Sequence, residues 1–263
     1  MAKVFTFDAA HCNGCHNCQI ACKDEHCDQA WLPYAAAQPL TGQFWCKLNE
    51  TVRGQVPVVR VAYEVAICNH CANAPCIAAG GGAVYRRDDG LVVIDPAQAK
   101  GLKGLVESCP VGAIYYNETA DLPQKCTGCA HLLDNGWDVP RCVDACPTEC
   151  FRFVDESELD LSAYETLPEL EGLGPKVYYL DRPKRFVAGC VVDMAAEEVV
   201  IGAKVELLDA NGTVVSVTQS DEFGDFKFDQ VEKSAYTVEV LGKRLAADVT
   251  ERDLTLGDID VSV

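Results

Sequence analysis

The sequence predicts an α+β protein with two domains: a cysteine-rich domain over residues 1–185 and a small antiparallel β-sandwich over residues 186–263. Three observations lead to this prediction. Fifteen of the sixteen cysteines stand before residue 151, and short apolar stretches in that part alternate with loops rich in glycine and proline. After residue 186, strand-length segments alternate apolar and polar side chains, as expected for sheets with one buried face.

The first cysteine group lies close to the N-terminus. Its members follow the spacing C-x2-C-x2-C-x3-C and are Cys12, Cys15, Cys18 and Cys22. This is the spacing of a bacterial ferredoxin motif, in which three thiolates hold one 4Fe-4S cluster and the fourth reaches a neighbouring cluster. The group therefore predicts a ferredoxin-like polyferredoxin domain with more than one cluster.

Two further groups complete the set. Cys68, Cys71 and Cys76 form one, with an isolated Cys109 before a proline, and Cys126, Cys129, Cys142 and Cys146 form the other. If each motif lends its last cysteine to its partner's cluster, three ligand sets follow. They are Cys12, Cys15, Cys18 and Cys146 for cluster 1; Cys22, Cys126, Cys129 and Cys142 for cluster 2; and Cys68, Cys71, Cys76 and Cys109 for cluster 3.

A reciprocal fourth cluster would need four more cysteines around the middle group. Those positions hold Gly80, Ala99, Leu102 and Leu105. Since all four ligands are missing together, we expect that a whole cluster was lost and that apolar side chains fill its space.

Other uses of these cysteines are less consistent with the pattern. A disulfide framework suits short secreted chains, and the start of this sequence shows no secretory leader. Zinc could bind Cys68, Cys71, Cys126 and Cys129 with help from His11, His16, His70 and His131, but zinc leaves the first group unexplained. The histidines are expected at the surface or around the clusters. Cys27, Cys46, Cys150 and Cys190 fit no site and are expected to be structural thiols.

The elements follow in order along the chain. A short strand is expected within residues 89–96, partly helical structure within residues 156–171, and a strand over residues 177–180 that packs back on the first domain. About seven strands are expected after residue 186, with a hairpin turn at Asn211-Gly212. That number is enough for a small sandwich of the prealbumin or Cna-B type.

Charge and hydropathy limit the partners. The formal net charge is −18, which makes nucleic acid an unlikely ligand. No apolar run approaches the length of a membrane span, so we expect no direct membrane insertion. Without a leader, the chain is expected in the cytoplasm, or exported folded with a partner that carries a twin-arginine signal.

The cysteine-rich part resembles the iron-sulfur subunits of the DMSO reductase family of molybdopterin enzymes. The whole chain is similar to the small subunits of the transhydroxylase and catechol dehydroxylase branch, which act on pyrogallol-type and catechol-type compounds. The similarity rests on the lost cluster, on the stretches 80–85, 89–90 and 124–134, and on a terminal sandwich with the segment 223–228. Lys23 departs from the usual pattern, because Cys22 is followed by lysine where Cys109 and Cys146 are followed by proline.

The resemblance implies a non-catalytic electron-transfer subunit with three 4Fe-4S clusters. A large partner subunit would carry molybdenum bound by bis-molybdopterin guanine dinucleotide and would transfer hydroxyl groups between polyhydroxylated aromatics or remove them reductively. A further electron donor would be a second partner. The cluster of Cys12, Cys15, Cys18 and Cys146 would lie nearest the molybdenum. The alternatives are an iron-sulfur subunit for an oxyanion, sulfur compound or sulfoxide reductase, an independent polyferredoxin, and a sandwich that serves adhesion or carbohydrate binding.

Overall fold

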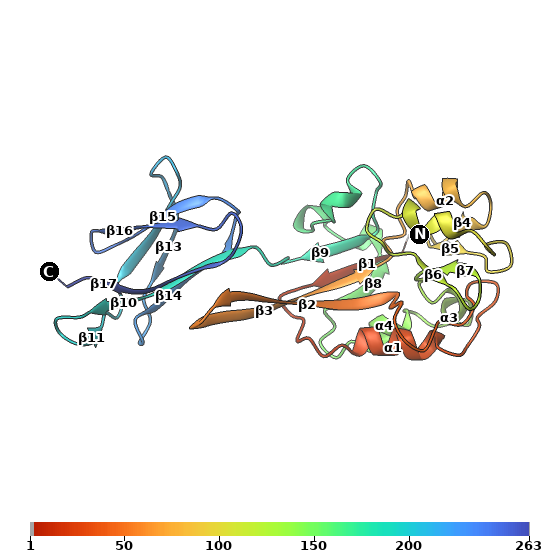
Figure 1. Ribbon diagram of the computed structural model, residues 1–263, viewed down its shortest axis with the longest axis horizontal. Helices are drawn as coiled ribbons and strands as arrows, with labels where there is room; N and C mark the ends of the chain where they lie inside the picture. The colour runs from red at the N-terminus through yellow and green to blue at the C-terminus, as the bar shows by residue number, and fades with distance from the viewer. Residues whose placement is uncertain (1–2, 263) are drawn as a thin grey trace. The chain divides into compact units, whose positions relative to one another are not determined.

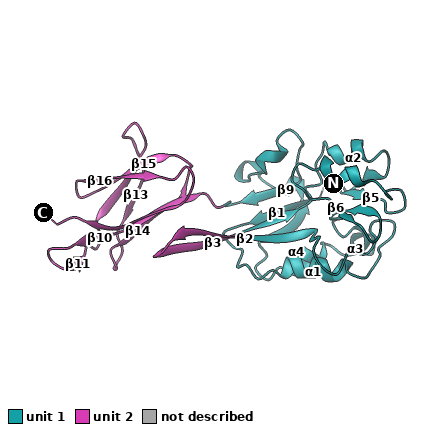
Figure 2. Cartoon of the chain, viewed as in Figure 1, with its two compact units in different colours: residues 1–50, 63–182 teal, residues 51–62, 183–263 magenta. Residues whose placement is uncertain are grey.

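The computed structural model describes residues 3–262 and divides into two compact units (Figure 2). Unit 1 contains the chain up to Glu50 together with Tyr63–Arg182. Unit 2 contains Thr51–Ala62 and the chain from Pro183 onward. Residues 1, 2 and 263 lie outside the described part, and so does the prediction about a leader, which rests on the first residues.

A three-stranded sheet forms the centre of unit 1 (Figure 1). Its middle strand β1 (Lys3–Asp8) pairs antiparallel with β8 (Phe151–Asp155) and parallel with β9 (Val177–Leu180). Phe5, Phe7, Phe151 and Tyr179 are at most 1% exposed. The pairing of β9 with β1 confirms that residues 177–180 return to the cysteine-rich domain.

The remaining elements of unit 1 are short, because its loops follow the cysteine groups. The α-helices are α1 (Asn17–His26), α2 (Pro75–Ala79), α3 (Ala130–Asp134) and α4 (Arg141–Asp144), and the 3-10 helices are η1 (Lys103–Ser108), η2 (Glu156–Glu158), η3 (Leu161–Ala163) and η4 (Pro168–Leu170). Two small hairpins are β4 (Val84–Arg86) with β5 (Val92–Ile94), and β6 (Tyr115–Asn117) with β7 (Leu122–Gln124). The helices η2 to η4 confirm partly helical structure within residues 156–171. None of the helices within residues 3–262 is both long and apolar enough to span a bilayer.

Unit 2 is a sandwich of two four-stranded sheets. One sheet contains β10 (Arg185–Asp193), β11 (Glu198–Val199), β14 (Asp225–Val231) and β17 (Leu254–Asp260). The other has the order β13 (Val214–Gln219), β12 (Lys204–Leu208), β15 (Ala235–Val240) and β16 (Lys243–Asp248). Asn211-Gly212 forms the predicted turn between β12 and β13, where Gly212 has a φ of 79°. Inward residues of both sheets, among them Val187, Val205, Phe226 and Val238, form one apolar core.

Two features of the fold differ from the sequence prediction. The sandwich is not purely antiparallel, because β10 pairs parallel with β17. The described residues are also mostly β, with 38% in strands and 15% in helices, so the helical share is smaller than an α+β class implies. The difference arises because turns and very short helices, rather than long ones, connect the cysteine groups.

The hairpin of β2 (Cys46–Gln55) and β3 (Val58–Ile67) was not foreseen from the sequence. Its distal part belongs to unit 2, where the Arg53 side chain reaches both carboxylate oxygens of Asp253, at 3.0 and 2.7 Å. Asp253 is 4% exposed and also accepts a hydrogen bond from the backbone N–H of Phe186. A buried carboxylate needs such partners, so this ion pair ties the hairpin tip to the sandwich.

Candidate metal centres

Three turns with the same backbone shape begin the three cysteine groups. In each Cys-x2-Cys turn, the residue before the second cysteine has a left-handed backbone. These residues are Gly14 (φ 71°), His70 (φ 44°) and Gly128 (φ 64°). Their backbone N–H groups donate to the sulfur of the first cysteine, at 3.5 Å from His70 to Cys68 and 3.3 Å from Gly128 to Cys126, and likewise from Gly14 to Cys12. Hydrogen bonds of this kind favour a thiolate over a thiol, as an iron ligand requires.

Two of these turns have no room for a side chain. A Cβ atom at Gly14 would lie 2.2 Å from Cζ of Tyr63, and one at Gly128 would lie 2.7 Å from Cδ1 of Leu91. Leu91 is 1% exposed and therefore has little freedom to move. The backbone angle favours glycine at both positions, and packing against the buried Leu91 adds a second reason at Gly128.

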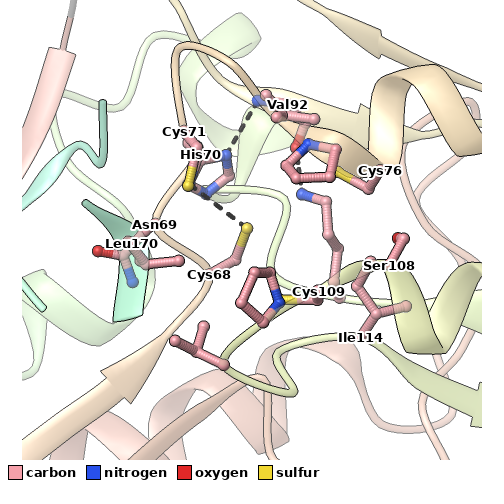
Figure 3. Close-up of a pocket in the computed structure, with 15 residues that line it drawn as sticks. Cys68, Asn69, His70, Cys71, Cys76, Val92, Ser108, Cys109, Ile114 and Leu170 are labelled. Atoms are coloured by element: carbon pink, nitrogen blue, oxygen red, sulfur yellow. Dashed lines mark hydrogen bonds between the residues drawn. The ribbon is translucent and has the colours of Figure 1, made fainter. Parts of the chain in front are cut away.

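The cysteines of the third predicted set line one cavity. Cys68, Cys71, Cys76 and Cys109 line the same pocket, together with His70 and Lys125 (Figure 3). Burial, followed by repulsion from Cys68, raises the pKa of the Cys71 thiol to about 11. Burial also raises the pKa of Cys76, and the backbone N–H of Ala113 donates to the sulfur of Cys109 at 3.3 Å. Four thiols grouped in this way need a positively charged occupant before they ionise together.

The second predicted set is deeply buried. Cys22, Cys126, Cys129 and Cys142 are at most 5% exposed. Burial, followed by repulsion from Cys142, Cys126 and Cys129, raises the pKa of Cys22 well above its usual range. Burial and then Cys142 have the same effect on the pKa of Cys129. The thiol of Cys22 therefore lies among cysteines more than a hundred residues further along the chain.

The sheet brings Cys12 and Cys146 of the first predicted set near each other. In the antiparallel pair of β1 and β8, Phe7 lies opposite Phe151, so the chain that leaves β1 towards Cys12 meets the chain that arrives from Cys146. Cys12 interacts electrostatically with Cys18 and Cys146, although a hydrogen bond with Cys150 has the largest effect on its pKa and lowers it. Cys15 is exposed, and within residues 3–262 no contact places its sulfur beside the other three.

Two cysteines to which the sequence assigned no site lie beside these sets. Cys46 is fully buried and forms hydrogen bonds with Cys142 and Cys18, one from the second set and one from the first. The sulfur of Cys150 lies 3.6 Å from that of Cys146. Cys150 stands at the same distance after Cys146 as Ala113 does after Cys109. Comparison of the two loops could therefore have identified Cys150 as a neighbour of the first set. Cys46 lies on β2, and no cysteine spacing indicates that it lies near the sites.

The positions of the missing fourth set belong to an apolar cluster. Ala99 and Leu105 are at most 3% exposed, and Leu102 packs against them together with Val84 and Ile94. A Cβ atom at Gly80 would lie 2.4 Å from Cγ2 of Val84. Apolar side chains therefore occupy the space around these four positions.

Polar side chains complete the surroundings of the thiols. The ammonium of Lys125, a residue that is 2% exposed, donates to the backbone carbonyls of Val92 and Cys126. The imidazole Nδ1 of His70 accepts the backbone N–H of Val92 at 2.9 Å. Lys23 points to the carbonyls of Pro39 and Gly42 at 3.0 and 2.7 Å, so its charge is held by the backbone rather than aimed at the thiols.

The donors surround a space instead of converging on one point. Within residues 3–262, no three His, Cys, Asp or Glu side chains are grouped closely enough to hold a single metal ion. In a 4Fe-4S cluster each thiolate binds a different iron atom, so its four ligands stand apart from one another. The N–H···S bonds and the cavity that the third set lines fit such a cluster.

Comparisons with known proteins agree with this chemistry. A family model described as a 4Fe-4S dicluster domain matches residues 59–156. The small subunit of pyrogallol hydroxytransferase from Pelobacter acidigallici is 40% identical over 247 residues, which are 89% of this chain and 88% of that protein. One subunit of the anaerobic dimethyl sulfoxide reductase of Escherichia coli (strain K12) is 32% identical over 180 residues, which are 66% of this chain and 85% of that protein.

Among solved structures, the major pilin subunit of Bacillus cereus matches 32% of this chain and 31% of its own, with 18% identity and a TM-score of 0.27.

The Gly128→Ala substitution is expected to damage the turn around Cys126. The left-handed backbone alone costs an alanine about 1–2 kcal/mol, and the overlap with Leu91 adds about 1–3 kcal/mol. Thermal unfolding and the iron content of anaerobically purified protein measure the loss. Gly42→Ala is the matched control, because Gly42 has a φ of 66° and open space around its Cβ position. Equal effects of the two substitutions would show that packing at Gly128 is unimportant.

Proposed function

The chain belongs to the family of iron-sulfur electron-transfer subunits that includes the pyrogallol hydroxytransferase small subunit and the matching subunit of anaerobic dimethyl sulfoxide reductase, and we propose that it holds three 4Fe-4S clusters. We propose further that it exchanges electrons with a large catalytic subunit. When bound, each cluster accepts and returns electrons through its iron atoms. The residues of this chain bind the clusters, separate them from water and set the order in which electrons pass.

The proposed ligand sets are those derived from the cysteine spacing. The proximity of Cys12 to Cys146, and of Cys22 to Cys126 and Cys129, supports the crossed pairing. The shared cavity supports the third set, which closes on Cys109. The backbone N–H groups that donate to sulfur would stabilise the ionised ligands in all three sets.

A count of three clusters is supported by the filling of the fourth position. Ala99, Leu102 and Leu105 belong to a close-packed apolar cluster and offer no group that binds iron. Where apolar side chains fill the position of a lost cluster, burial of apolar surface stabilises the fold in place of metal binding. The chain would then carry a shorter electron path than a four-cluster relative.

The three sites would stand in a row with the second in the middle. Cys46 contacts Cys18 of the first set and Cys142 of the second. Burial has the largest effect on the pKa of Cys126 in the second set and raises it. Repulsion from Cys142, and then from Cys68 of the third set, raises this pKa further. Cys15 is the exposed ligand of the first set, so this end of the row would face the catalytic partner.

We assign the catalytic chemistry to the partner, a large subunit with molybdenum bound by bis-molybdopterin guanine dinucleotide. The hydroxytransferase match favours polyhydroxylated aromatics as substrates, because it covers 89% of this chain whereas the sulfoxide reductase match covers 66%. The second candidate function is therefore electron transfer for a sulfoxide or oxyanion reductase. This chain would contribute no catalytic residue in either case.

The Cys146→Ser substitution is expected to perturb the same cluster as Cys15→Ser, although the two residues are far apart in sequence. Electron paramagnetic resonance of the reduced, anaerobically purified protein separates the clusters by their signals. Cys190→Ser is the control, since Cys190 lies on β10 of the sandwich and belongs to no proposed set. The crossed pairing is wrong if Cys146→Ser instead changes the signal that Cys129→Ser changes.

The isolated chain is expected to be reduced and reoxidised without converting any phenol, and the complex with its large subunit is expected to act on pyrogallol-type or catechol-type compounds. Hydroxyl transfer between two rings consumes no electrons overall. Reductive dehydroxylation replaces a ring C–OH with C–H, consumes two electrons and two protons, and releases water. Assays with and without reduced viologen distinguish the two reactions. Turnover by this chain alone, or turnover by the complex only on a sulfoxide or oxyanion, would contradict the proposal.

A further inference from the structure

His70 occupies a position that is glycine in the two equivalent turns. All three residues have a left-handed backbone and donate their N–H to the sulfur of the preceding cysteine. Such a backbone is unfavourable for a residue with a Cβ atom, although histidine tolerates it better than most. Strain that persists at a binding site suggests that the side chain has a function there.

The His70 ring is fixed in one orientation and one tautomer. Its Nδ1 lies 2.9 Å from the backbone nitrogen of Val92, which can only donate. Nδ1 is therefore the acceptor, and the proton of the neutral ring is on Nε2. The ring also stacks on Phe5, with centroids 6.1 Å apart and planes inclined by 22°. Because Nδ1 accepts the N–H of Val92, Nε2–H is the ring group that remains available to donate a hydrogen bond.

The Nε2–H group has no acceptor among residues 3–262. His70 is 2% exposed, and no oxygen, nitrogen or sulfur atom of the described chain accepts from Nε2. A buried donor without an acceptor is destabilising, so native structures rarely keep one without a reason. His70 lines the same cavity as Cys68, Cys71, Cys76 and Cys109 (Figure 3).

The backbone of Val92 forms hydrogen bonds with both His70 and the buried Lys125. Its N–H donates to His70 Nδ1, while its carbonyl accepts from the ammonium of Lys125, which also lines the cavity. Val92 itself is 0% exposed and lies in β5. The peptide groups of one rigid strand therefore position the imidazole against the cavity.

We propose that His70 donates a hydrogen bond from Nε2–H to a sulfur atom of the cluster that Cys68, Cys71, Cys76 and Cys109 hold, and thereby raises the reduction potential of that cluster. This inference rests on the proposed function. Hydrogen bonds to the sulfur atoms stabilise the reduced, more negatively charged cluster. His70 is thus a positioning and tuning residue that distinguishes the third site from the two sites whose turns contain glycine.

The test compares His70→Asn with His70→Gln in the full-length, anaerobically purified protein. Asparagine tolerates the left-handed backbone and keeps an acceptor near the Nδ1 position, but it has no donor at the Nε2 position. Glutamine keeps an N–H donor near the Nε2 position. Redox titration followed by paramagnetic resonance is expected to show a lower potential for the third cluster in His70→Asn. A tenfold fall in the ratio of reduced to oxidised cluster corresponds to about 59 mV for one electron.

Several outcomes separate the inference from the proposed function. With iron content unchanged, an unaltered third-site potential in His70→Asn would overturn the inference, and a potential in His70→Gln close to that of the wild type would support it. If His70→Asn loses the third cluster, wild-type protein with histidine labelled with ¹⁵N only at the imidazole Nε2 decides instead, because the backbone nitrogen of His70 already donates to the sulfur of Cys68: hyperfine coupling of the ring label to the reduced third cluster supports the hydrogen bond, and its absence rejects it. A wild-type protein without a third cluster would contradict the proposed function itself.

Discussion

The structure of unit 1 depends on the cost of placing thiolates close together inside a protein. Burial, followed by repulsion from Cys142, raises the pKa of Cys22, Cys126 and Cys129. Without a cation, the raised pKa keeps the thiols of Cys22, Cys126 and Cys129 protonated. They become negatively charged only when a metal is bound. Binding of iron is therefore coupled to folding, because the unfolded chain offers no such arrangement. This coupling explains how a unit with one small sheet and very short helices holds a defined structure.

Backbone geometry then determines which sulfur atoms accept hydrogen bonds that stabilise their ionised form. The left-handed turns direct N–H groups to the sulfur atoms of Cys12, Cys68 and Cys126. The central sheet supplies the long-range part, since the pairing of β1 with β8 brings the first and third cysteine groups to the same end. The proposed row of sites, with its exposed end at Cys15, would follow from these two constraints. In this proposal the electron path depends on turns and strand pairing, and no residue in the sandwich of unit 2 is a cluster ligand.

The sequence was informative where the chemistry is local and less so where it depends on distant contacts. Spacing predicted groups of ligands because a ligand motif needs fixed distances along the chain, and the structure places Cys22 near Cys126 and Cys129 and lines one cavity with the cysteines of the third set. Alternation predicted the strands around Val205 and Phe226. No local pattern records that residues 51–62 join unit 2 through Arg53 and Asp253, or that β10 pairs parallel with β17. Cys46 was also missed as a neighbour of the sites, since it contacts Cys18 and Cys142 from a strand far from both in sequence.

The measurement that tests this account most directly is the iron and sulfide content of anaerobically purified protein. Three 4Fe-4S clusters require about twelve iron and about twelve sulfide per chain. The account predicts this stoichiometry, together with less than one zinc per chain. A reproducible content of about sixteen iron, or stoichiometric zinc in place of iron, would contradict it.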